Sequence, residues 1–94
     1  MGRGTVMDIR LIGPMPSSTT TLMYNFMVNG ELFPLGITHQ ALVVLVPPVG
    51  SATSQQIEAI GKAKIELETV NLGKRPQPGI VVRTEDVKEI RKYL

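Results

Sequence analysis

Alternating apolar and polar residues predict two strands in the first third of the chain. In the segment 5–12 (TVMDIRLI), three apolar side chains share one parity and two charged side chains take the other. In the segment 21–28 (TLMYNFMV), Leu22, Tyr24, Phe26 and Val28 share one parity. A period of two is typical of a strand with one buried face. We therefore expect two half-buried strands here.

A hairpin turn follows the second strand at once. Asn29 and Gly30 tolerate the positive φ angles that a type I′ turn requires. The expected return strand, 31–38, contains Pro34 and Gly36, and both residues are unfavourable inside a strand that is hydrogen-bonded on both sides. We therefore expect the return strand to lie at a sheet edge or to contain a bulge.

The segment 41–46 (ALVVLV) is apolar at every position and rich in β-branched residues. This composition is typical of a strand covered on both faces. It predicts a central strand at the middle of the core, ended by Pro47 and Pro48.

A helix is expected after Pro48, because Thr53 and Gln56 have the spacing of a capping box. The residues that follow fit two structures. The segment 53–72 can form one long helix with an apolar face, or Gly61 can end a short helix before a strand over 62–72, where charged and apolar residues alternate. We favour helix followed by strand, because one long helix places Ile65 and Leu72 on its polar side.

The remaining segments predict loops over 13–21 and 73–79, a short strand over 80–82 and a final helix. Thr84 is expected to cap this helix, with Val87, Ile90 and Leu94 as its buried stripe. The predicted class is α+β: a mainly antiparallel sheet starting with the hairpin at Asn29–Gly30, a short or long helix after Pro48, and a C-terminal amphipathic helix.

Composition narrows the classes of protein to consider. With 94 residues the chain is long enough for one domain, expected over 1–94, whose modest core would gain from apolar contact with a second copy. The absence of cysteine excludes disulfides and thiolate metal sites and favours an intracellular protein. The N-terminus lacks an apolar stretch of signal-peptide length, and the longest apolar run is too short to span a membrane. We therefore expect a cytoplasmic protein without a membrane partner.

The titratable residues give no catalytic pattern. His39 is the only histidine, and no nucleophile or carboxylate is adjacent to it in the sequence. The acidic residues alternate with lysines or suit the first turn of a helix. We therefore predict no catalytic residues, no metal, no cofactor and no small-molecule substrate, and more readily a binding protein than an enzyme.

The basic residues suggest a nucleic-acid interface as an alternative function. Lys74 and Arg75 are expected on an exposed loop, and further basic residues surround and occupy the last helix. The net charge of +2 argues little, because affinity for phosphates depends on a local basic patch. The candidate residues are Lys74, Arg75, Arg83, Lys88, Arg91 and Lys92.

A weaker candidate is an anion site where the 41–46 segment is followed by a helix start. Backbone amides and hydroxyls of Gly50, Ser51, Thr53 and Ser54 are of the right type for a phosphate or carboxylate. The spacing matches neither a Walker A motif nor a dinucleotide fingerprint, so simple helix capping is the preferred interpretation.

Surplus apolar strand surface gives the leading hypothesis. Met23 and Met27 have the opposite parity to Leu22, Tyr24 and Phe26, so their strand has apolar side chains on both faces, more than a small monomer can cover. We therefore expect a non-enzymatic protein-interaction or structural module that forms a homo-oligomer. The candidate interface residues are Met23, Met27, Val44 and Val46.

Overall fold

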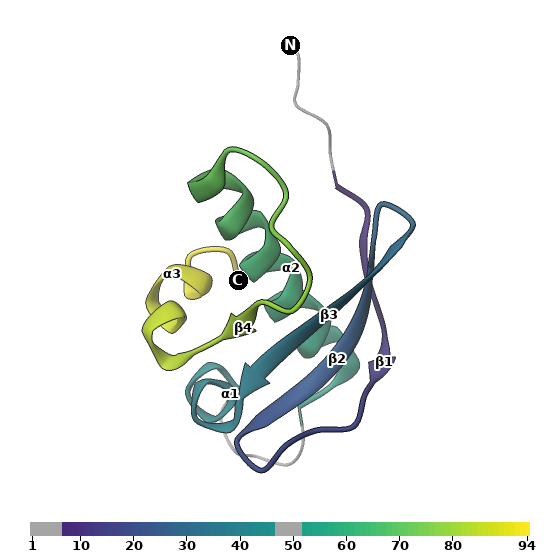
Figure 1. Ribbon diagram of the computed structural model, residues 1–94. Coiled ribbons are helices and arrows are strands. Elements are labelled where there is room, and N and C mark those ends of the chain that lie inside the picture. Colours follow the sequence, from purple (N-terminus) through teal and green to yellow (C-terminus); the bar gives the residue numbers. More distant parts are fainter. Residues whose placement is uncertain (1–6, 47–51) are drawn as a thin grey trace.

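The computed structural model describes residues 7–46 and 52–94. Four strands, three helices and one 3-10 turn follow one another along the chain (Figure 1). In order they are β1 (Ile9–Pro14), β2 (Thr21–Val28), β3 (Glu31–Thr38), α1 (His39–Leu45), α2 (Ser54–Leu72), β4 (Val81–Val82), η1 (Thr84–Asp86) and α3 (Val87–Arg91). The predicted α+β class is confirmed.

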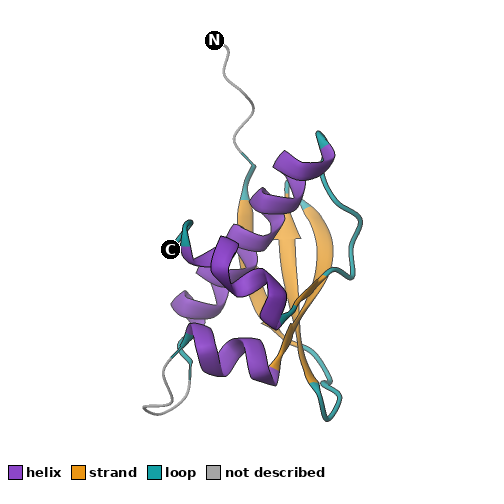
Figure 2. Ribbon diagram, turned by 90° about the vertical axis from the view of Figure 1, so that its left-hand side faces the viewer, coloured by secondary structure: helices purple, strands orange, loops and turns teal. Residues whose placement is uncertain are grey.

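The strands form one sheet in the order β1-β2-β3-β4, with β4 parallel to β3 and the other pairs antiparallel. All three helices lie on one side of this sheet (Figure 2). The core lies between the two layers, where side chains of the predicted inward parity, such as Phe26, Val28 and Ile9, are buried. Among the described residues, no helix is long and apolar enough to cross a membrane.

The predicted hairpin at Asn29–Gly30 is confirmed. Both residues have positive φ, 51° for Asn29 and 84° for Gly30, as a type I′ turn requires. The turn brings Val28 opposite Glu31, and the pairing continues without a register shift along the whole of β2 and β3. The turn chemistry therefore fixes which face every side chain of these two strands takes.

The expectation that β3 lies at an edge or contains a bulge was wrong. β3 pairs with β2 along its whole length and with β4 through Gly36 and Ile37. Counting from the two-residue turn, Pro34 falls at a position whose nitrogen points away from β2. Its missing N–H therefore costs no β2–β3 hydrogen bond, while its carbonyl accepts from the Gly79 amide at 2.7 Å. The bulge lies instead in β1, between Leu11 and Gly13.

The central strand expected over 41–46 was also wrong, because these residues belong to helix α1 and its C-cap, Val46. The Thr38 side chain caps this helix by accepting from the Ala41 amide. Ala41 is fully buried and Val43 is largely exposed. A short run that is apolar throughout has no periodicity to distinguish helix from strand, and here the N-cap decides.

The strand favoured over 62–72 was wrong as well, since α2 continues without interruption from Ser54 to Leu72. The expected capping box of Thr53 and Gln56 is present and begins this helix. Ile65 is completely buried, because α2 packs on the sheet and also contacts α3. Gly61 does not end the helix; it lies inside it, directly against the ring of Phe26.

The C-terminal helix is shorter than expected. The chain passes from β4 into the 3-10 turn η1, so Thr84 lies inside that turn and is not the N-cap of α3. The Asp86 carboxylate instead accepts from the Arg83 amide at 2.9 Å. Val87 and Ile90 are buried as expected, whereas Leu94 lies beyond the helix end and is exposed, which corrects that part of the predicted stripe.

Candidate functional site

The sheet face opposite the helices is the most distinctive surface of the protein. In β2 and β3 every second side chain points into the core, and the side chains between them point to this face. Gly36 confirms the assignment, because a Cβ built on it would meet the side chains of Thr21, Met23 and Val81. We call this the open face; its residues are Arg10, Thr21, Met23, Asn25, Met27, Leu32, Pro34, Gly36, Thr38 and Val81.

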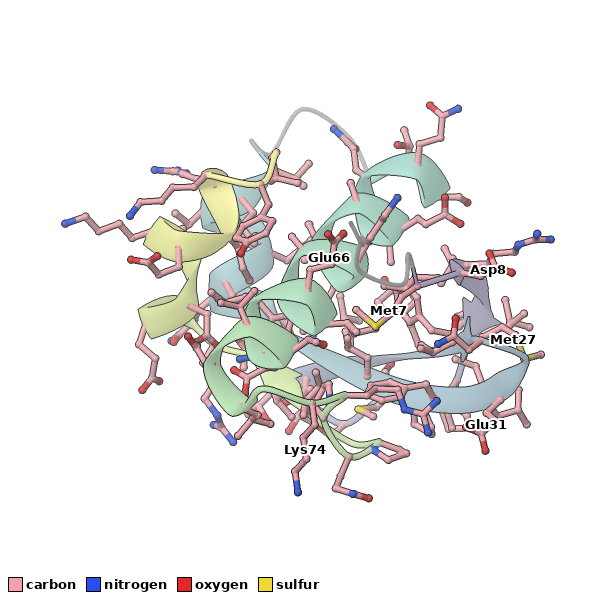
Figure 3. All side chains as sticks on the ribbon, turned by 90° about the horizontal axis from the view of Figure 1, so that it is seen from above. Met7, Asp8, Met27, Glu31, Glu66 and Lys74 are labelled. Atoms are coloured by element: carbon pink, nitrogen blue, oxygen red, sulfur yellow. The ribbon has the colours of Figure 1, made fainter. Side chains whose placement is uncertain are left out.

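Half of the open-face residues have apolar side chains. Met27 lies opposite Leu32, whose side chain is 58% exposed, and Met23 lies opposite Gly36. Figure 3 shows Met27 directed away from the helices, whereas Met7 lies between α2 and the sheet. Among the ten residues named for this face, the one charged side chain, Arg10, is paired with Asp8 at 3.0 Å. The open face therefore has an apolar row, formed by Met23, Met27, Leu32, Pro34 and Val81, beside neutral polar side chains and one compensated charge.

Asn25 lies near the middle of the open face, opposite Pro34 on one side and Gly13 on the other. Its Oδ1 is shielded from solvent and is the one buried side-chain polar atom without a hydrogen-bond partner in the part of the chain that the structure describes. Such an acceptor loses its hydration without compensation. We therefore expect this residue to lower the stability of the sheet that carries the face.

We expect Asn25→Val to raise the free energy of unfolding by about 1 kcal/mol, because it removes an uncompensated acceptor and adds a residue with higher strand propensity. Urea unfolding at low protein concentration measures the change. Asn25→Ser, which keeps a polar group, is the matched control and should gain less. A decrease in stability for the valine variant would show that the amide makes a favourable interaction.

The two outer strands of the sheet, β1 and β4, are poor templates for a further strand. On β1, the outward amide of Leu11 donates to the Glu58 carboxylate of α2 at 2.9 Å, the bulge breaks the regular spacing, and Pro14 has no N–H. On the other side, β4 is only two residues long and turns directly into η1. These features block edge-to-edge pairing, so the face is the part of the sheet that remains available for contact.

The four residues expected at an oligomer interface occupy two different places. Met23 and Met27 are on the open face. Val44 is exposed on α1, where its carbonyl accepts from the Arg91 guanidinium at 2.9 Å, and Val46 lines a hollow of about 460 Å³ beside the start of α2. The structure therefore brings only the two methionines together, and parity reasoning missed Leu32 and Pro34 because β3 was taken for an irregular strand.

The basic residues predicted to contact nucleic acid fall into separate groups. Lys74 projects from the end of α2 (Figure 3), and Arg75 forms an ion pair of 2.7 Å with Glu31 at the hairpin end of β3. Arg91 contacts α1, which begins at the opposite end of β3, and Lys92 pairs with Glu89. Arg83 and Lys88 lie before and within α3. Nucleic-acid binding remains a prediction, with several of its cations engaged in contacts inside the chain.

The candidate anion site at the start of α2 is only partly described, because Gly50 and Ser51 lie outside the described residues. Thr53 accepts from the Gln56 amide at 3.1 Å, and its own amide donates to the Gln56 side chain at 2.8 Å. Ser54 is the first residue of the helix. The capping interpretation of Thr53 is therefore confirmed.

Two further hollows adjoin the sheet. One, of about 510 Å³, lies between the β1 bulge and the first turns of α2 and includes Tyr24 and Glu58. Burial raises the pKa of the Tyr24 phenol above its usual range, so the hydroxyl stays a neutral donor at physiological pH. The other contains His39. Within residues 7–46 and 52–94 no cluster of three histidine or acidic side chains is arranged to hold a metal ion.

No family model matches the chain, and neither a curated protein nor a solved structure shows a significant match to it.

Proposed function

We propose that this protein is a self-associating interaction module whose open face packs against the same face of a second copy. The observation that carries the proposal is the row of apolar side chains on a sheet face that no helix covers. Contact with a second copy removes this surface from water, which is the main favourable term in most protein association. The lack of cysteine in the sequence supports the cytoplasm as the compartment.

Charge favours a protein surface over a nucleic acid as the occupant of the open face. Binding to a phosphate backbone needs several uncompensated cations, whereas Arg10 is neutralised by Asp8 and Arg83, which shares a hollow with Thr21 and Thr38 at one end of the face, is a single charge. In a two-fold dimer the same face is used by both copies, so residues of the face contact residues of the same face in the second copy. An almost uncharged apolar patch has no like-charge repulsion to overcome in that arrangement.

Size predicts that the association is weak. Three strands of up to eight residues have a flat footprint of about 350 Å², from a rise of about 3.3 Å per residue and a strand spacing of about 4.8 Å. A standard stable interface buries about 800 Å² on each partner. The open face alone is smaller, so we expect a reversible dimer with a dissociation constant between about 10 µM and about 100 µM.

Sedimentation equilibrium between about 10 µM and about 1 mM protein tests the proposal. The apparent mass should rise from the monomer mass of 10.3 kDa towards twice that value. Leu32→Glu should weaken association at least about tenfold, because it places a charge inside the apolar contact. Val70→Glu is the matched control: Val70 is 71% exposed on α2, so this change should leave the mass curve unaltered.

Two results would overturn the proposal. One is a monomer mass across the whole concentration range. The other is equal association by wild type and Leu32→Glu, because copies would then meet through another surface. Circular dichroism of both variants checks folding, which should be intact because Leu32 and Val70 are both exposed.

A further inference from the structure

A hollow lined only by polar residues lies where β2, β3 and the segment before η1 meet. Its volume is about 330 Å³, at the small end of ligand-binding cavities. It is lined by residues 19–21, all threonine, and by Thr38, His39, Gln40 and Arg83. The lining therefore combines a guanidinium, an imidazole, an amide and four hydroxyls with no carboxylate.

The threonine wall of this hollow is held in place by hydrogen bonds. The Ser18 hydroxyl oxygen accepts from the amides of Thr20 and Thr21, at 3.3 Å and 3.1 Å. The Thr20 carbonyl accepts from the His39 amide at 3.1 Å, which ties the loop to the start of α1. A wall fixed before a ligand arrives loses little conformational entropy on binding.

Arg83 supplies the charge of the hollow. In the described part of the chain its guanidinium forms no ion pair, whereas its backbone is held by the hydrogen bond that the Arg83 amide donates to the Asp86 carboxylate. That carboxylate also accepts from Lys64 at 3.1 Å, so its negative charge is already compensated. Arg83 is therefore positioned by its backbone while its five N–H donors remain for a ligand.

We propose that this hollow binds the phosphate group of a small molecule. A tetrahedral phosphate presents several acceptor oxygens, which match a guanidinium fork together with hydroxyl donors on the facing wall. His39 offers at least one ring N–H in either protonation state. Free phosphate and a phosphate monoester share this chemistry, and the volume admits either.

NMR amide shifts during titration with inorganic phosphate, against sodium chloride at equal ionic strength, test the site. Saturable shifts should concentrate at Thr20, Thr21, His39 and Arg83. Arg83→Gln should weaken apparent affinity at least about tenfold, the usual effect of losing a charged hydrogen-bonding partner. Lys88→Gln removes one positive charge from α3 at a residue that does not line the hollow, so its effect should stay below about twofold.

Two further titrations identify the ligand chemistry. Phenyl phosphate binding more tightly than inorganic phosphate at the same residues assigns the site to a monoester; the reverse order assigns it to free phosphate. Acetate shifting the same amides with equal affinity would overturn the assignment to phosphate. Weak shifts spread evenly over the chain, or an equal loss of phosphate affinity in Arg83→Gln and Lys88→Gln, would show a general effect of charge and would contradict binding in the hollow.

Discussion

Replacing Gly61 with alanine is expected to lower the free energy of unfolding by about 2 kcal/mol. A Cβ at this position would overlap the Phe26 ring, at 2.5 Å from Cε2 and 2.9 Å from Cε1. The ring is completely buried and has little room to move. Direct overlap with a buried ring places the cost at the upper end of the about 1–3 kcal/mol typical of overpacking, and the gain of about 1 kcal/mol that alanine brings to a helix interior leaves a net loss of about 2 kcal/mol.

A double-mutant cycle distinguishes this clash from other effects of the alanine. Phe26→Leu shortens the side chain that Gly61 faces, so Gly61→Ala should cost clearly less in that background than in the wild type. Urea unfolding gives all four free energies. Equal costs in both backgrounds would contradict a contact between the two positions.

Asp86→Ala is also expected to lower the free energy of unfolding by about 2 kcal/mol. Lys64 is only 5% exposed, and its ammonium group is held between Asp86 at 3.1 Å and Glu68 at 2.9 Å. Removing Asp86 leaves this buried charge with one partner and also deprives the Arg83 amide of its acceptor. Glu68 remains, which keeps the cost below that of a fully unpaired charge.

Lys64→Met is the matched comparison, since it removes the buried charge itself and keeps most of the side-chain volume. Its cost should be clearly smaller than that of Asp86→Ala, because the two carboxylates are partly exposed and can return to water. Chemical unfolding of both variants in the same buffer tests the order. A larger loss for Lys64→Met would mean that the ion pairs themselves contribute most of the stability.

The strands were predictable where hydrophobicity alternates and the turn was specified by its residues. Parity placed Phe26 and Val28 in the core, and Asn29–Gly30 set the register. The segment 41–46 failed because an unbroken apolar run carries no period. The segment 62–72 failed because its charges alternate by coincidence: Lys64 is buried and neutralised, which a sequence pattern cannot indicate.

The candidate site was predictable only in part. The alternation in β2 predicted that Met23 and Met27 lie on the face opposite the core and form an apolar surface there. Leu32 was missed because Pro34 indicated an irregular strand. The polar hollow gave no signal, since Thr20, His39 and Arg83 are far apart in the sequence and meet only through the topology. Alternation within a strand predicts which of its side chains are buried, whereas contacts between residues far apart in the sequence depend on the whole fold.

The hydrogen bond from the Leu11 amide to the Glu58 carboxylate makes protection of the β1 edge depend on helix α2. Glu58 lies in the early turns of α2, which are stabilised by the Thr53 cap. Local opening of those turns would withdraw the carboxylate and leave the Leu11 amide without its acceptor, so that only the bulge and Pro14 would still oppose pairing at this edge. The early turns of α2 therefore contribute to the protection of this sheet edge as well as to the packing of the core.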